Sequence, residues 1–109
     1  MMVKLFRSVR GLVKQELNLA NRQNGDHFHS THEAYGVIME EHTEAWDETI
    51  NVDAATDRLL TAIRQDNPKG LVAAAKDIER HAMLAASEYI QVAAMARKLR
   101  ESERASRDE

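Results

Sequence analysis

The chain contains no cysteine, one proline and four glycines, and aromatic residues occupy 5% of its 109 positions. Without cysteine it can form no disulfide framework, thiolate nucleophile or cysteine-based zinc site. No apolar run approaches the roughly 18 residues that a membrane-spanning helix needs. Basic side chains interrupt residues 1–19 at Lys4, Arg7, Arg10 and Lys14. We therefore expect neither a secretory signal nor contact with a membrane, and we expect a cytoplasmic protein.

The length of the chain bounds its architecture. A sequence of 109 residues fits one domain, and we expect residues 1–109 to form it. A domain of this size buries only roughly 65% of the surface that its unfolded chain exposes, so its core is thin. Pairing with further copies would enlarge that core. We therefore expect a homo-oligomer, either a homodimer or a homotetramer.

The hydrophobic pattern is helical, because no segment sustains the alternation of a strand and the β-branched residues are scattered. Ser30 and Glu33 have the spacing of a capping box at a helix start. Asn67 and Pro68 fit an N-cap and a first helical position. We expect helices over residues 3–21, 30–49, 53–65 and 69–104, with a frayed polar end at 104–109. The predicted fold class is all-α, a four-helix bundle.

Acidic residues are concentrated in one part of the sequence. Residues 29–57 contain eight acids and no lysine or arginine, whereas the whole chain has a formal net charge of −3. Such a block either forms a solvated face or gathers carboxylates that need a cation. The direction in which the acids point decides between these two interpretations.

Several of these acids fall on the apolar side of the predicted second helix. At about 100° per residue, Glu41 and Glu48 lie inside the apolar arc that contains Ala34. Glu44 lies at the edge of that arc, and Glu40 flanks it. Glu41 and Glu44 are three residues apart, so they are neighbours on one helix surface. This helix is therefore expected to direct carboxylates toward the core.

The predicted fourth helix repeats this anomaly. Glu88 lies in the middle of its apolar stripe, Gln91 lies at the edge, and Asp77 and His81 fall on the same stripe nearer the start. A buried carboxylate must become neutral, pair with a base or bind a metal. One interpretation is a structural network neutralised by Arg80, Arg97 or His81. The other is a cation site, and oxygen-only ligands suit Mg²⁺ or Mn²⁺.

At these residues the sequence resembles a known family. Residues 28–48, FHSTHEAYGVIMEEHTEAWDE, and residues 88–96, EYIQVAAMA, are similar to the MazG-like all-α nucleoside triphosphate pyrophosphohydrolases. The family signature is E-E-x-x-E on one helix and E-x-x-D on a later one. Glu40-Glu41-His42-Thr43-Glu44 matches the first half. The second half reads Glu88-x-x-Gln91, which replaces an anionic ligand by an amide oxygen.

The resemblance implies a function and a set of site residues. Family members hydrolyse nucleoside triphosphates to monophosphates and pyrophosphate with Mg²⁺. Glu41, Glu44 and Glu88 would then hold the metal, with Gln91 as a weaker ligand and Asp77 as a substitute acid. Glu40 is the candidate base for the attacking water. Aromatic side chains available for the nucleotide base are Phe28, Tyr35 and Trp46, although Trp46 lies off the metal face.

Other functions compete with this one. A ferritin-like di-iron bundle is disfavoured, since none of the five histidines has a glutamate three residues before it. A non-catalytic helical module, which binds a nucleotide or a protein and has a degenerate metal site, is supported by the exchange at Gln91. Nucleic-acid binding is disfavoured, because the basic residues of the first helix have no aromatic residues interleaved.

Overall fold

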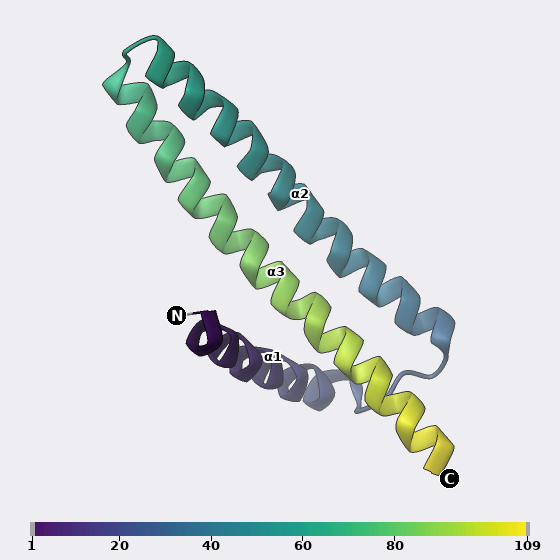
Figure 1. Cartoon of the computed structure of the whole chain (residues 1–109). Helices are drawn as coiled ribbons and strands as arrows, with labels where there is room; N and C mark the ends of the chain where they lie inside the picture. The colour runs from purple at the N-terminus through teal and green to yellow at the C-terminus, as the bar shows by residue number, and fades with distance from the viewer. Residues whose placement is uncertain (1, 109) are drawn as a thin grey trace. The chain divides into compact units, whose positions relative to one another are not determined.

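The structure is a computed structural model that describes residues 2–108. Within this range the chain forms three helices and no strand: α1 is Met2–Asn24, α2 is Thr31–Arg64 and α3 is Pro68–Asp108 (Figure 1). The all-α fold class is therefore confirmed. No helix among the described residues has the combination of length and apolar character that crossing a membrane would require.

The expected number of helices is wrong. The segments 30–49 and 53–65 are not separate helices, because α2 continues through residues 50–52 without a break. Asn51 and Asp53 are weak helix formers, but no glycine or proline interrupts the segment. Its apolar spacing also continues, since Val52, Ala55 and Leu59 extend the stripe that contains Ala45. Burial along that stripe outweighs the local propensities. At the other end, α3 runs to Asp108 instead of stopping near Arg104.

Turn and capping residues set the helix boundaries as the sequence indicates. Gly25 follows α1 with a φ of 82°, and its N–H donates to the carbonyl of Asn21 at 2.9 Å. Glycine adopts this left-handed conformation without the steric cost of a side chain. At the start of α2, the N–H of Glu33 donates to Oγ of Ser30 at 3.1 Å. Ser30 is therefore the N-cap that the capping-box pattern predicts.

The turn between α2 and α3 is three residues long, and each of its N–H groups donates a hydrogen bond. Asp66 has a φ of 52°, its N–H donates to the carbonyl of Ile63 at 3.1 Å, and the N–H of Asn67 donates to that of Ala62 at 2.9 Å. This pair of bonds is a Schellman motif. Oδ1 of Asn67 then accepts the N–H of Gly70 at 3.1 Å, so Asn67 caps α3 as predicted.

The chain divides into two compact units. The hairpin unit is Thr43–Glu88, in which the end of α2 and the start of α3 lie side by side after the short turn (Figure 1). The terminal unit contains the chain up to His42 and from Tyr89 onward, so it includes α1, the start of α2 and the end of α3.

Small side chains form the core of both units. The buried apolar residues are Leu17 and seven alanines: Ala34, Ala45, Ala55, Ala62, Ala74, Ala85 and Ala94. On α2 these alanines share one stripe with Glu41, Glu48 and Val52, at alternating spacings of three and four residues. Alanines on such a stripe allow helix backbones to approach closely. No large side chain among the described residues is fully buried, so the core is as thin as the chain length indicates.

Many large apolar side chains remain on the surface of the single chain. On α2 the exposed side chains include Tyr35, Met39, Trp46, Ile50, Leu60 and Ile63, and Trp46 is 53% exposed. On α1 they include Leu5, Phe6 and Leu12, and on α3 they include Leu71, Val72 and Met83. Isolated exposed apolar residues are ordinary, but so many beside an alanine core are not. One chain leaves much of its apolar surface in contact with water.

Candidate functional site

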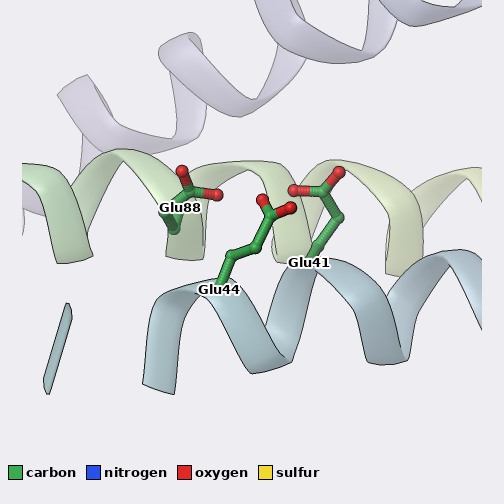
Figure 2. A group of neighbouring side chains, drawn as sticks. All are labelled: Glu41, Glu44 and Glu88. Carbon is green, nitrogen blue, oxygen red and sulfur yellow. The ribbon is translucent and has the colours of Figure 1, made fainter. Parts of the chain in front are cut away.

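Three acidic side chains converge where the motifs predict. Glu41 and Glu44 lie one turn apart on α2, and Glu88 projects from α3 toward them (Figure 2). Each offers one carboxylate oxygen, and these oxygens all lie within 4.8 Å of one another. We call these three residues the acidic cluster. The sequence separates Glu44 from Glu88 widely, and the antiparallel course of α2 and α3 in the hairpin unit brings them together.

The cluster lies partly within the packing stripe, as the helical periodicity predicts. Glu41 and Glu88 are half-buried, whereas Glu44 is exposed. Glu41 follows buried Ala34 by seven residues and Glu88 follows buried Ala85 by three, so each lies on the stripe of its own helix. Half-burial weakens solvent screening of the repulsion between the carboxylates. The arrangement therefore favours a cation close to the three carboxylates.

The donor set and spacing of the cluster fit a small divalent cation. Mg²⁺ takes octahedral oxygen ligands at about 2.1 Å, which places neighbouring ligand atoms about 3 Å apart and opposite ones about 4.2 Å apart. The three carboxylate oxygens are within 4.8 Å of one another, so side-chain rotamer adjustments would have to draw them closer to reach these separations. Carboxylate oxygens also suit Mn²⁺.

Other predicted site residues lie outside this cluster. Glu40 is exposed and occupies the next position of α2 from Glu41. Asp77, the possible substitute acid, instead pairs with Nη2 of Arg58 at 3.2 Å. Gln91 is half-buried and follows Glu88 by one turn of α3.

Gln91 lines a cavity in the terminal unit, and so does Glu41. This cavity, which we call the three-helix cavity, has a volume of about 290 Å³. Each helix contributes one stripe: Glu16, Leu19, Ala20, Gln23 and Asn24 from α1, Val37 and Glu41 from α2, and Gln91, Ala94 and Met95 from α3. Its walls combine amides and carboxylates with aliphatic side chains. A concave site of this composition suits a small organic ligand.

Glu48, another acid on the buried stripe of α2, forms a pair with a histidine. Oε2 of Glu48 lies 2.6 Å from Nδ1 of His81 in the hairpin unit, and both side chains are 23% exposed. Because a carboxylate only accepts, Nδ1 carries the proton of this bond. The hydrogen bond from His81 lowers the pKa of Glu48 from its ordinary value of 4.5, with a further bond from Asn51 acting in the same direction. The structural pairing of an inward acid with His81, which the sequence suggested, is therefore present at Glu48.

The basic residues of α3 are engaged in different ways. Lys98 is only 4% exposed, and its ammonium lies 4.8 Å from the centre of the Phe28 ring. Oγ of Ser102 accepts the N–H of Phe28 at 3.2 Å, which fixes the same segment against α3. Arg97 pairs with Glu101 at 3.0 Å. Phe28 is thus packed on a lysine, and its role beside a nucleotide base stays a prediction.

Sequence reasoning missed the contribution of α1 to the cavity. Glu16, Leu19, Ala20 and Gln23 have the spacing of one helix stripe, so their common face could have been noticed. From the sequence, only the basic residues of this helix were considered, as a possible contact to nucleic acid. What faces it depends on tertiary packing, which the pattern of one helix does not specify.

Comparisons of the chain with protein-family models, with curated proteins and with solved structures find no match. The similarity to the MazG-like enzymes rests on the residues quoted above.

Proposed function

We propose that this protein is a Mg²⁺-dependent nucleoside triphosphate pyrophosphohydrolase of the MazG-like type, which converts a ribo- or deoxyribonucleoside triphosphate and water to the monophosphate and pyrophosphate. The observation that supports the proposal best is the convergence of Glu41, Glu44 and Glu88. These are the acids that the resemblance marks as ligands. They come from separate motifs in the sequence, and their meeting is what the proposed activity requires. Removal of unwanted nucleotides would be the corresponding cellular task.

In this proposal the chain's own residues divide the work. Glu41, Glu44 and Glu88 hold the ion through carboxylate oxygens, and Gln91 offers a neutral amide oxygen beside them. Bound Mg²⁺, or Mn²⁺ in its place, supplies neutralisation of charge on the triphosphate and at the α-phosphorus. Glu40, exposed beside Glu41, accepts the proton of the attacking water. Glu40 then releases this proton to the surrounding water.

A homodimer or homotetramer is part of the proposal. The support is the apolar surface of the single chain, above all the exposed side chains of α2 that include Tyr35, Trp46 and Ile50. Burying such side chains stabilises an assembly by roughly 25 cal/mol per Å² of apolar area. Two copies of the hairpin unit would then supply the four helices of a bundle.

The activity is tested by a screen for pyrophosphate release over the common nucleoside triphosphates with Mg²⁺. Glu41→Gln and Glu44→Gln should each lower the rate by roughly 10²-fold or more, since the loss of even outer-shell groups costs 10- to 100-fold. Glu79→Gln, which changes an exposed acid of α3, is the matched control and should keep the rate. Circular dichroism confirms that each variant folds. Wild-type rates in both cluster variants would refute the site.

Metal binding has a separate readout. Millimolar Mg²⁺ or Mn²⁺ should raise the melting temperature, because an ion that binds only the folded state at about 100 times its Kd stabilises it by about 2.7 kcal/mol. The shift should disappear in Glu44→Gln. A melting temperature that neither ion changes would favour structural burial of the acids.

The second candidate function is a non-catalytic module that binds a nucleotide or a protein. The observation that favours it is Gln91, an amide at the position where the family motif has an aspartate. Nucleotide binding that is unaffected by Mg²⁺, without turnover of any nucleotide, would support this candidate against the first.

A further inference from the structure

The three-helix cavity and the acidic cluster share one residue. Glu41 belongs to the cluster and also lines the cavity of the terminal unit. Glu41 is thus the residue at which a ligand bound in the cavity would meet the cluster. The volume of about 290 Å³ lies near the lower end of the range for small-molecule sites, about 300–1,000 Å³.

We infer that the three-helix cavity receives the base of the nucleotide and selects bases with an exocyclic amino group, with Glu16 as the residue that makes the selection. The preferred substrates are then nucleotides of cytosine, adenine or guanine over those of uracil and thymine. This inference rests on the proposed function, and it names the substrate class of the same site.

The charge of the cavity restricts which part of a ligand can enter it. Its lining includes the carboxylates of Glu16 and Glu41 but no lysine or arginine. A phosphate or another anionic group would be repelled from such walls unless a cation accompanied it. The end of the ligand that enters the cavity must therefore be neutral. The base is the neutral end of a nucleotide.

The hydrogen-bonding requirement of Glu16 restricts the base further. An ionised carboxylate only accepts hydrogen bonds, so Glu16 requires a donor on the ligand. An exocyclic amino group supplies two N–H donors at the edge of the ring. Uracil and thymine present a single N–H between two carbonyl oxygens, and these oxygens would face the carboxylate. Polar groups of a site that are left without partners lead it to reject such analogues.

The remaining walls fit the other parts of a base. The side-chain amides of Gln23, Asn24 and Gln91 can both donate and accept, so they can satisfy ring nitrogens and carbonyls. Leu19, Val37 and Met95 offer aliphatic surface for the faces of a planar ring. Glu16 and Gln23 lie on the same stripe of α1, two turns apart, so one helix presents a carboxylate and an amide to the ligand.

The test compares dCTP with dUTP. Cytosine has an exocyclic amino group at the ring position where uracil has a carbonyl oxygen. In the wild type, kcat/KM for pyrophosphate release with Mg²⁺ should favour dCTP by at least about tenfold. In Glu16→Gln the preference should fall several-fold, mainly through KM, because an amide can serve either base. Glu103→Gln changes an exposed acid of the terminal unit outside the cavity and should keep the wild-type preference.

Binding of the same two nucleotides is measured by calorimetry with Ca²⁺, which also takes oxygen ligands. This measurement separates the two proposals. Preference for dCTP in binding without any hydrolysis would uphold the cavity assignment and overturn only the enzymatic function. Hydrolysis or binding of dCTP and dUTP with equal efficiency would overturn the assignment while leaving the pyrophosphohydrolase intact. An unchanged preference in Glu16→Gln would overturn the role of Glu16.

Discussion

At the scale of single residues, the acids of the packing stripe are treated in two ways. Oε2 of Glu48 lies 2.6 Å from Nδ1 of His81, and this hydrogen bond stabilises the charged form of Glu48. Glu41 and Glu88 each offer a carboxylate oxygen within 4.8 Å of one from Glu44. Glu48 therefore has a structural role, and the acidic cluster is the group of carboxylates whose arrangement suits a cation.

The pairing of Glu48 predicts a dependence of stability on pH. Its folded-state pKa is lowered from the ordinary value of 4.5, so the folded protein binds fewer protons there than the unfolded chain does. The contribution of this group is present above the ordinary value and is lost as the pH falls through the lowered pKa. We expect wild type to exceed Glu48→Gln in free energy of unfolding near pH 6.

This difference should shrink between about pH 5 and pH 3. Urea unfolding at several pH values measures it, with Glu103→Gln, an exposed acid, as the control that shows little change. A difference between wild type and Glu48→Gln that stays constant down to pH 3 would contradict the role of the pair.

Helical periodicity predicted the direction of the clustered acids, whereas contacts between distant segments could not be predicted from the sequence. Glu41 and Glu44 share a helix face, and Glu88 falls on the apolar stripe of its own helix, so their inward direction could be expected. The contact between Phe28 and Lys98 joins residues 70 positions apart and has no pattern in either segment. The packing of Phe28 on Lys98 could therefore not be expected from the sequence.

At the scale of elements, the starts of α2 and α3 were predicted better than the number of helices. Ser30 and Asn67 act through short-range hydrogen bonds that their side chains determine. The continuity of α2 through residues 50–52 depends on burial along the whole stripe. Local propensity is a weak guide there, because packing against α3 in the hairpin unit adds free energy that no short window contains.

The end of α2 offers a stabilising substitution. Asp66 adopts a φ of 52° in the Schellman motif, where glycine has no steric penalty. Asp66→Gly should therefore raise the free energy of unfolding by about 0.5–1 kcal/mol, after allowance for the greater entropy of glycine in the unfolded chain.

Thermal or urea unfolding measures the effect of Asp66→Gly. Gln65→Gly, one position earlier in the same turn, is the control and should destabilise, because Gln65 has no positive φ to relieve. A loss of stability in Asp66→Gly would show that the side chain of Asp66 contributes more than its backbone strain costs.

The alanine core makes a second prediction at this scale. Ala45 is completely buried on the α2 stripe, so a larger side chain there must separate the helices or adopt a strained rotamer. Ala45→Leu should lower the free energy of unfolding by about 1–3 kcal/mol. Ala54→Leu on the exposed side of the same helix should change it by less than about 0.5 kcal/mol. Equal effects in the two variants would mean that the helices are not closely packed at Ala45.

At the scale of the whole molecule, the proposed self-association is supported by the small size of the buried side chains. The buried apolar residues of one chain are seven alanines and one leucine, while large side chains such as Trp46 and Tyr35 are exposed. Alanine contributes little to hydrophobic burial compared with a large apolar side chain, which contributes about 1.5–3 kcal/mol when fully buried. A partner subunit that covers the larger side chains would supply what the single chain lacks.

Trp46 provides the test of this assembly. Trp46→Glu should weaken association by at least about 10-fold, since aromatic side chains at the centre of interfaces commonly contribute 2 kcal/mol or more. Sedimentation velocity over a range of concentrations measures the change, and the melting temperature of the wild type should rise with concentration. Ala54→Glu introduces the same charge at an exposed small residue of α2 and serves as the control. A wild-type chain that sediments as a monomer at all concentrations would contradict the assembly.

The division into two units has a consequence for the order of folding. The hairpin unit is one uninterrupted segment, Thr43–Glu88, whereas the terminal unit is assembled from both ends of the chain. Contacts between segments that are close in sequence form at a lower entropic cost than contacts that close a long loop. The α2–α3 hairpin can therefore form early, and the terminal unit, which needs both ends of the chain, forms after it. The three-helix cavity belongs to the terminal unit, so it is completed in the later stage of folding.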